Sequence, residues 1–197
     1  MRIYHSPQTR STRVVWTLEE IGEPYDVTIL TREERQADAH RKLHPLGRVP
    51  VLENGQGILL ESSAQCLHLA DVHPEAKLVW PIGSRERALV YQWLFFGMLE
   101  LEIPIIDVMR YREEQPPLAE AATERFTACA ALVERALDGH EYLVGDRFSV
   151  ADIVTGGGVL GFARHMGLVD DFPRIGAYVD RLDARPARQR ALAVGTS

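Results

Sequence analysis

One stretch near residue 50 constrains the fold of this chain more than any other part of the sequence. Val51 and Leu52 are strand formers, and Pro50 precedes them. Proline has no backbone N–H and therefore fits the first position of a strand. A Gly/Asn turn at 54–57 then separates this strand from a second apolar run, Ile58-Leu59-Leu60. Two apolar runs joined by such a turn predict a β-hairpin.

A helix is expected directly after the hairpin. Glu61 and Ser62 precede apolar residues at helical spacing, so Ser62 can cap the helix start. The free N–H groups and partial positive charge of a helix start favour a bound carboxylate. If the Val49–Pro50 peptide bond is cis, the N–H and C=O of Val49 turn toward a cleft instead of a sheet partner.

Composition and charge exclude several classes of protein. The 197 residues are 46% hydrophobic and 25% charged, as in ordinary soluble proteins, and the net charge is -6. Without a basic tract, neither nucleic acid nor an anionic membrane is an expected partner. The most apolar window, 89–101, contains two polar residues and is expected to be too short to span a bilayer. Cys66 and Cys129 lack CxxC spacing, which predicts a reducing cytoplasm.

The first half of the chain alternates strands and helices. A strand is predicted at 2–5, a helix from Ser11 to Gly22, and a second strand at 25–30. This order predicts a βαβ unit with parallel strands. Residues 31–47 are polar and partly helical. With the hairpin and its helix, the order becomes βαβαββα, which is the thioredoxin-like arrangement. We expect this α/β domain at 1–75 and a linker at 76–84.

The second half, 85–197, is predicted to be all-helical. Its first helix is expected to bury one apolar face, to kink at Pro104 and to end at Pro116-Pro117. The residues expected on that face are Leu89, Trp93, Phe96, Leu99 and Ile103. Further helices are predicted at 126–137, from 149, at 172–182 and at 187–194. Ser149 and Asp152 have the spacing of a capping box.

Hydroxyl side chains surround the start of the first helix. Ser6, Thr9 and Ser11 lie there, with Arg10 and Arg13 close by in the sequence. A thiol of pKa about 8.5 needs roughly 2 kcal/mol of stabilisation to be half ionised at pH 7. One hydrogen bond to a charged group supplies about 1.5–3 kcal/mol. A single Thr or Ser can therefore activate an external thiol, although the same hydroxyls can also simply cap the helix.

Two other patterns favour structural roles. His40 and His44 stand at i,i+4, but no clear acidic third ligand accompanies them, so we predict no metal site. The glycines at 156–158 are not followed by Lys-Ser/Thr, so they do not form a phosphate loop. We expect them to let helices approach closely. Taken alone, Arg48 is interpreted as a solvated surface charge. Glu61-Ser62 is interpreted as an ordinary helix start.

Four motifs in order resemble the cytosolic glutathione transferases, over essentially the whole chain. The segment from Ser6 to Gly22 is similar to the N-terminal segment of bacterial and theta-like members. Residues 44–52, HPLGRVPVL, resemble the family's Asn-Pro-x-Gly-x-Val-Pro-x-Leu. Glu61-Ser62 resembles the pair that holds the γ-glutamyl end of glutathione, and 149–152 resembles a capping box of the family's helical domain.

The resemblance implies a glutathione site on the first domain. Val49, beside a cis Pro50, would pair its backbone with the cysteinyl part of glutathione. Glu61 and Ser62 would hold the γ-glutamyl carboxylate and amine. Arg48 would lie near the glycyl end, and Arg10 would be a further glutathione contact. Thr9 falls where theta-like relatives carry a catalytic Ser, with Ser11 as the alternative donor.

Some positions depart from the family pattern. Thr9 replaces Ser, and His44 replaces the usual Asn. Position 10 is Arg rather than the Cys of beta-type bacterial enzymes, which argues against chemistry through a protein cysteine. Tyr4 ends the first strand, but a Tyr-type mechanism is not expected.

The function implied by the resemblance is that of a glutathione transferase in cytoplasmic detoxification. The thiolate of glutathione, its co-substrate, would attack a small hydrophobic electrophile, with no metal and in a homodimer. The residues expected to contact the electrophile are Met98, Glu102, Ile105 and Met109. Two alternatives are a glutathione-dependent disulfide or peroxide reductase and a non-catalytic interaction protein with the same fold.

Overall fold

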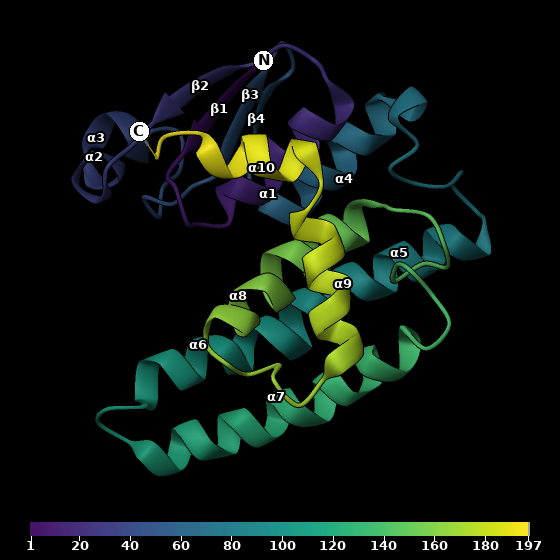
Figure 1. The fold of residues 1–197 in the computed structure, drawn as a ribbon. Helices are drawn as coiled ribbons and strands as arrows, with labels where there is room; N and C mark the ends of the chain where they lie inside the picture. Colours follow the sequence, from purple (N-terminus) through teal and green to yellow (C-terminus); the bar gives the residue numbers. More distant parts are fainter. Residues whose placement is uncertain (197) are drawn as a thin grey trace. The chain divides into compact units, whose positions relative to one another are not determined.

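The computed structural model describes residues 1–196 (Figure 1). The chain forms two compact units. The first comprises Met1–Val79 together with the C-terminal segment from Ala184 onward, and the second comprises Trp80–Asp183.

A four-stranded sheet forms the centre of the first unit. The strands are β1 (Arg2–His5), β2 (Asp26–Ile29), β3 (Val51–Asn54) and β4 (Gly57–Leu59), in the order β2-β1-β3-β4. β1 pairs with β2 in parallel, with Ile3 opposite Val27. β1 and β3, and β3 and β4, are antiparallel. The predicted βαβ unit, the hairpin and the thioredoxin-like order are confirmed.

Helices cover this sheet. They are α1 (Ser11–Ile21), α2 (Arg32–Gln36), α3 (Asp38–Arg41) and α4 (Ser62–Val72), followed by the short 3-10 helix η1 (Pro74–Ala76). The polar segment after β2 thus contains two short helices, and a reciprocal capping box between Thr31 and Glu34 begins α2.

The two faces of β1 have different neighbours. Successive side chains of a strand point to opposite faces of the sheet. Ile3 and His5 are buried, and His5 bonds to the first residue of α1, Ser11. Tyr4 points the other way, and its ring lies 5.9 Å from that of His40 on α3. α1 and α3 therefore lie on opposite faces of the sheet.

The C-terminal helix α10 (Pro186–Ala193) packs against α1 within the first unit (Figure 1). Arg185 forms a two-pronged ion pair with Glu20, at 2.7 and 2.8 Å, and the Arg188 guanidinium lies 4.8 Å from the Trp16 ring centroid. The sequence had suggested a helical domain running to the C-terminus. The segment from Ala184 belongs instead with the sheet, because its arginines meet the acidic end of α1.

The second unit is helical. Its elements are α5 (Arg85–Phe96), the π-helical segment η2 (Gly97–Leu101), α6 (Glu102–Tyr111), α7 (Pro116–Ala136), the π-helical segment η3 (Asp152–Leu160), α8 (Gly161–His165) and α9 (Pro173–Asp183). Pro116 begins α7 rather than ending the preceding helix, which stops at Tyr111. Proline suits the first turn of a helix, where no N–H is needed.

The buried face of the long helix differs from the prediction. Trp93 is buried as expected, but Leu99 and Ile103 are 53% and 41% exposed. Leu101 and Ile105 are fully buried in their place. The π-helical turn at 97–101 is the reason, because it widens the helix locally and shifts the inward-facing positions that follow it.

The same helical run meets the length and composition of a membrane span. Arg85–Tyr111 forms 27 residues of continuous helix, and its most apolar window has a mean hydropathy of 1.4. The apolar window 89–101 considered in the sequence covers only part of this helical run. Since 44% of that window is buried inside the structure, the run also fits the core helix of a soluble protein.

Asp152 organises the interior of the helical unit. Its Oδ1 accepts hydrogen bonds from the Tyr178 hydroxyl at 2.7 Å and the Leu143 N–H at 2.9 Å. Its Oδ2 accepts from the N–H of Ser149 at 2.8 Å and from the Ser149 hydroxyl at 3.0 Å. The predicted link from Asp152 back to Ser149 is confirmed. Four donors offset part of the desolvation of this fully buried carboxyl group, and burial still raises its pKa.

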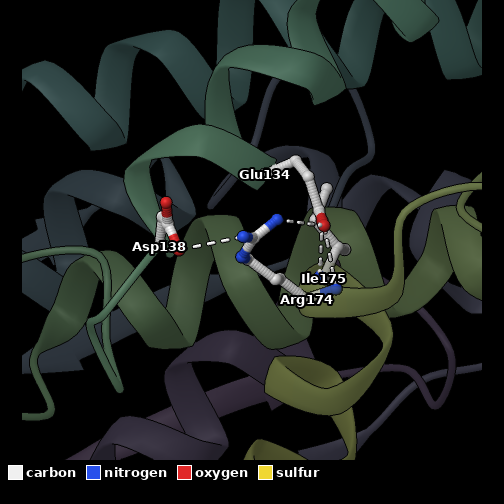
Figure 2. Close-up of polar contacts among 4 residues, drawn as sticks. All are labelled: Glu134, Asp138, Arg174 and Ile175. Carbon is white, nitrogen blue, oxygen red and sulfur yellow. Dashed lines mark hydrogen bonds and ion pairs between the residues drawn. The ribbon is translucent and has the colours of Figure 1, made fainter.

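Glu134 on α7 caps the start of α9 (Figure 2). Its carboxylate accepts hydrogen bonds from the N–H groups of Arg174 and Ile175, each at 3.0 Å. The Arg174 side chain also reaches Asp138 at 2.9 Å. The free N–H groups at the start of α9 are therefore occupied by a side chain from another helix.

Close helix packing at Gly156 gives a test of the helical unit. A Cβ at this position would overlap the Tyr178 hydroxyl and the Leu182 side chain. We expect Gly156→Ala to lower the free energy of unfolding by about 1–3 kcal/mol, measured by urea denaturation. Gly176→Ala in α9 is the control, because nothing lies within 4 Å of its new Cβ. It should be neutral or stabilising by up to about 1 kcal/mol. Equal stability of the two variants would contradict this packing.

Candidate functional site

The loop between β1 and α1 carries a connected set of hydroxyls. The Thr9 Oγ1 lies 2.7 Å from the Ser6 carbonyl oxygen and 2.7 Å from the Ser11 Oγ. The Ser11 Oγ accepts the Ser6 N–H at 3.2 Å and lies 2.7 Å from the His5 Nδ1. The helix cap position itself is occupied by Arg10, whose side chain makes no cap hydrogen bond.

Exposure separates the two candidate thiol donors. Ser11 is completely buried, and the atoms of His5, Ser6 and Thr9 surround its hydroxyl. Thr9 and Arg10 are half-buried at the surface of the loop. The geometry therefore favours Thr9 as the group that meets a ligand and gives Ser11 a role behind it.

The segment before β3 presents backbone groups. The Val49–Pro50 peptide bond is cis. Val49 is buried, and its N–H and C=O have no hydrogen-bond partner among residues 1–196. The neighbouring carbonyls are occupied, since His40 Nε2 binds the Arg48 oxygen at 2.8 Å and Gln65 Nε2 approaches the Pro50 oxygen at 3.4 Å. A buried backbone pair without partners suits an extended peptide ligand.

The start of α4 has no side-chain cap. Ser62 is its first helical residue rather than its cap, which corrects the predicted capping role. The cap position belongs to Glu61, which has φ 68° and makes no side-chain cap hydrogen bond. The Ser62 side chain is buried. N–H groups left without a side-chain cap at a helix start favour a bound carboxylate.

Gln65 joins the two parts of this region. It is fully buried, and its Nε2 donates to the Leu59 carbonyl at 2.6 Å as well as approaching the Pro50 carbonyl. One amide thereby ties the end of β4, the cis proline and α4 together. Sequence reasoning did not single out Gln65. The available signal was a polar residue on the apolar face of the predicted helix.

Several neighbouring groups shift the pKa of His44. The Leu46 N–H donates to its Nδ1 at 3.3 Å. Burial lowers the pKa of His44, the nearby His40 and Arg48 lower it further, and Glu61 raises it. The exposed side chains of Arg48 and Glu61 thus influence the same imidazole in opposite directions.

The structure also bears on the metal and thiol chemistry considered above. His40 binds the Arg48 carbonyl and His44 the Leu46 N–H, and no cluster of three or more metal-binding side chains occurs in the described part of the chain. Burial raises the pKa of the Cys66 thiol to about 11, with a hydrogen bond to Thr17 opposing the shift. Burial also raises the pKa of Cys129. Neither cysteine is a reactive thiolate at neutral pH.

The four residues expected to contact an electrophile all lie on the helical unit, on η2 and α6. Their exposure differs: Met98 is half-buried, Glu102 and Ile105 are buried, and Met109 is 51% exposed. Met109 lines a hollow of about 380 Å³ together with Phe162, His165 and Met166. The side chain of Ile105, at 0% exposure, contributes packing rather than an open surface.

Comparison with known proteins identifies the family of this chain. The model of the glutathione S-transferase N-terminal domain matches residues 9–72, and that of the C-terminal domain matches residues 101–189. The chain belongs to the glutathione S-transferase family. Each compact unit of this glutathione S-transferase thus contains a matched family domain. The predicted fold, a thioredoxin-like domain followed by a helical domain, is confirmed.

Individual relatives are distant but extensive. A probable glutathione S-transferase GSTF2 of Oryza sativa subsp. japonica is 29% identical over 204 residues, covering 96% of this chain and 94% of that protein. An elongation factor 1-gamma of Prunus avium is 32% identical over 160 residues, but these are only 37% of its length. The solved structure of a sphingomonad glutathione S-transferase complexed with glutathione has a TM-score of 0.87 and 27% identity, over 98% of this chain and 97% of that one.

The different positions of Ser11 and Thr9 predict different effects on stability. Ser11→Ala leaves the buried Ser6 N–H and His5 Nδ1 without a partner, so we expect the free energy of unfolding to fall by about 1–3 kcal/mol. Thr9→Val removes a half-buried hydroxyl at nearly constant volume and should cost less than about 1 kcal/mol. Urea denaturation of both variants measures this difference. If Thr9→Val were the more damaging change, the assignment of Ser11 as the structural hydroxyl would be wrong.

Proposed function

We propose that this family member is an active glutathione transferase of the Ser/Thr type, which ionises the glutathione thiol for attack on a small hydrophobic electrophile. The observation that carries the proposal is the unpartnered backbone of Val49, combined with an uncapped helix start at Ser62. A structural neighbour bound to glutathione supports the same ligand.

The first step of the argument is peptide binding. Glutathione is an extended tripeptide with a carboxylate at each end and an amine at one. The N–H and C=O of Val49 pair with its cysteinyl backbone. The open N–H groups and hydroxyl at Ser62 receive the γ-glutamyl carboxylate, and the exposed carboxylate of Glu61 receives the amine. Arg48 and Arg10 then supply positive charge for the glycyl carboxylate.

The second step is activation of the thiol. Thr9 is the loop hydroxyl with an exposed surface, and it precedes the start of α1. One hydrogen bond from a hydroxyl to a thiolate is worth about 1.5–3 kcal/mol, which lowers a thiol pKa by about one to two units. The helix start adds a smaller contribution of the same sign. A thiol of ordinary pKa thereby becomes substantially ionised at neutral pH without a protein cysteine.

The third step is the electrophile. Met98 and Met109 are apolar side chains with exposed surface on the helical unit, and thioethers adapt to flat or irregular ligands. We assign them to the hydrophobic substrate, with Glu102 at its polar edge and Ile105 packed behind. The shape of this region determines which electrophile binds.

The relative named elongation factor 1-gamma favours a second candidate, a transferase-like fold used for protein interaction. A scaffold of this kind has no use for an unpartnered Val49 backbone beside an uncapped helix. Calorimetric titration with glutathione separates the two, since a scaffold gives no heat of binding. A disulfide substrate assayed beside an aryl halide then distinguishes transfer from glutathione-dependent reduction.

Thr9 variants test the proposed activation. We expect Thr9→Val to lower kcat/KM toward an aryl halide by about 10- to 100-fold, because one hydrogen bond to the thiolate is lost. The affinity for glutathione measured by calorimetry should change little, since Thr9 does not hold the peptide. Thr9→Ser keeps the hydroxyl and should retain activity within a few-fold. Full activity in Thr9→Val would remove Thr9 from the mechanism.

We also propose that the protein forms a homodimer in the cytoplasm. Phe95, Leu99 and Ile103 are 67%, 53% and 41% exposed and recur every four residues on one helical run. We take these exposed apolar side chains, called the apolar stripe below, as an interaction surface. Cys66 and Cys129 are both free, as expected in a reducing compartment.

A charge in the apolar stripe tests the dimer. We expect Leu99→Glu to convert the protein to a monomer in light scattering at micromolar concentration, because association would bury an unpaired carboxylate. Ile82→Glu is the control, since Ile82 is 82% exposed but lies outside the stripe. A Leu99→Glu protein with unchanged mass would place the subunit contact elsewhere.

A further inference from the structure

His5 ends a hydrogen-bonded chain that begins at Thr9. The chain runs from Thr9 Oγ1 to Ser11 Oγ at 2.7 Å and from Ser11 Oγ to His5 Nδ1 at 2.7 Å. The other ring nitrogen of His5, Nε2, lies 3.3 Å from the carbonyl oxygen of Val194. His5 itself is 1% exposed, so it reaches a ligand only through the two hydroxyls.

The Val194 carbonyl oxygen, which contacts His5, fixes the direction of these hydrogen bonds. A carbonyl oxygen only accepts, so the neutral His5 ring carries its proton on Nε2 and leaves Nδ1 as an acceptor. Two acceptors lie within reach of the Ser11 hydroxyl, the Ser6 carbonyl oxygen at 3.1 Å and His5 Nδ1 at 2.7 Å. An unprotonated Nδ1 at the shorter distance requires a donor, so the single proton of Ser11 is placed toward His5. The Thr9 proton points to the Ser6 carbonyl or to Ser11 Oγ, both 2.7 Å away. In this state Thr9 offers a lone pair, rather than a proton, to a thiol beside it.

The geometry points to His5 as the final acceptor of the thiol proton of bound glutathione, with Thr9 and Ser11 as the relay. This inference rests on the proposed function, because it requires a glutathione thiol at Thr9. His5 does not touch the thiol and is a positioning residue that acts through the two hydroxyls.

The proton balance is complete without any other reactant. The S–H bond breaks as its proton passes to Thr9 Oγ1, the Thr9 proton passes to Ser11 Oγ, and the Ser11 proton forms an N–H bond at His5 Nδ1. Glutathione gains one negative charge and His5 one positive charge, so the net charge of the complex does not change. Every bond in the chain reverses, and Thr9 now donates to the thiolate.

The surroundings of His5 keep it neutral until glutathione is bound. Burial lowers the pKa of His5, and the Val194 carbonyl only partly opposes this effect. On α1, which supplies Ser11, and α10, which Val194 directly follows, no buried side chain is anionic; the buried charged ones are Arg13 and Arg188. A thiolate at the other end of the chain is the anion that offsets the charge on His5.

Nitrogen-15 NMR of the histidine rings tests the relay in the wild-type protein, with the His5 ring assigned through its bonds to the sequentially assigned backbone. With glutathione bound at pH 7, we expect both ring nitrogens of His5 to carry protons. With S-methylglutathione, which has no thiol proton to give, the ring should stay neutral. A neutral His5 beside a bound thiolate, seen by ultraviolet absorbance, would overturn the relay while leaving the proposed function intact.

His5→Gln supplies an independent kinetic test. The Gln amide can accept from Ser11 and donate to Val194, but it cannot take up a proton. We expect kcat toward an aryl halide at pH 7 to fall at least about tenfold, with the pH profile displaced to higher pH and the KM for glutathione nearly unchanged. An unchanged pH profile would count against the relay. Absence of glutathione binding to the wild-type protein would instead overturn the proposed function, and a misfolded variant leaves the NMR test decisive.

Discussion

The buried hydroxyl of Ser11 is the interaction on which the first unit and its site depend. It joins the end of β1, the following loop and the first residue of α1 through His5, Ser6 and Thr9. A buried polar group left without partners costs about 1–3 kcal/mol, so the loop is held in the one arrangement that satisfies all of them. Thr9 takes its position at the surface as a consequence of this buried network.

The second half of the site depends on Gln65 in the same way. Its amide binds carbonyls from two separate segments, at Pro50 and Leu59, and so sets the cis proline against the start of α4. Strand pairing cannot do this, because β3 begins only at Val51 and β4 ends at Leu59. The groups that would hold a peptide backbone and those that would hold its carboxylate are therefore positioned by a side chain in the interior.

The sequence predicted the parts of the structure that depend on local pattern. The hairpin, the βαβ order and the link from Asp152 to Ser149 follow from turn residues, periodicity and cap spacing. The inward face beyond residue 97 could not be predicted, because the π-helical turn there follows from packing, with Thr155 lying against Gly97. The roles of His5 and Gln65 were missed for a similar reason, since each depends on partners distant in the chain, such as Val194 for His5. The placement of α10 likewise depends on contacts made across the whole sequence.

The two helix starts at α4 and α9 differ in how their free N–H groups are satisfied. At α9 the free N–H groups are bound by Glu134, and nothing further is needed there. At α4 there is no side-chain cap, Glu61 adopts a backbone conformation that is unusual for a residue with a side chain, and the Ser63 hydroxyl and the Gln65 carbonyl are buried without partners. Each of these features costs on the order of 1–3 kcal/mol. Their concentration in five residues distinguishes the start of α4 from that of α9, where a side chain from another helix supplies the cap.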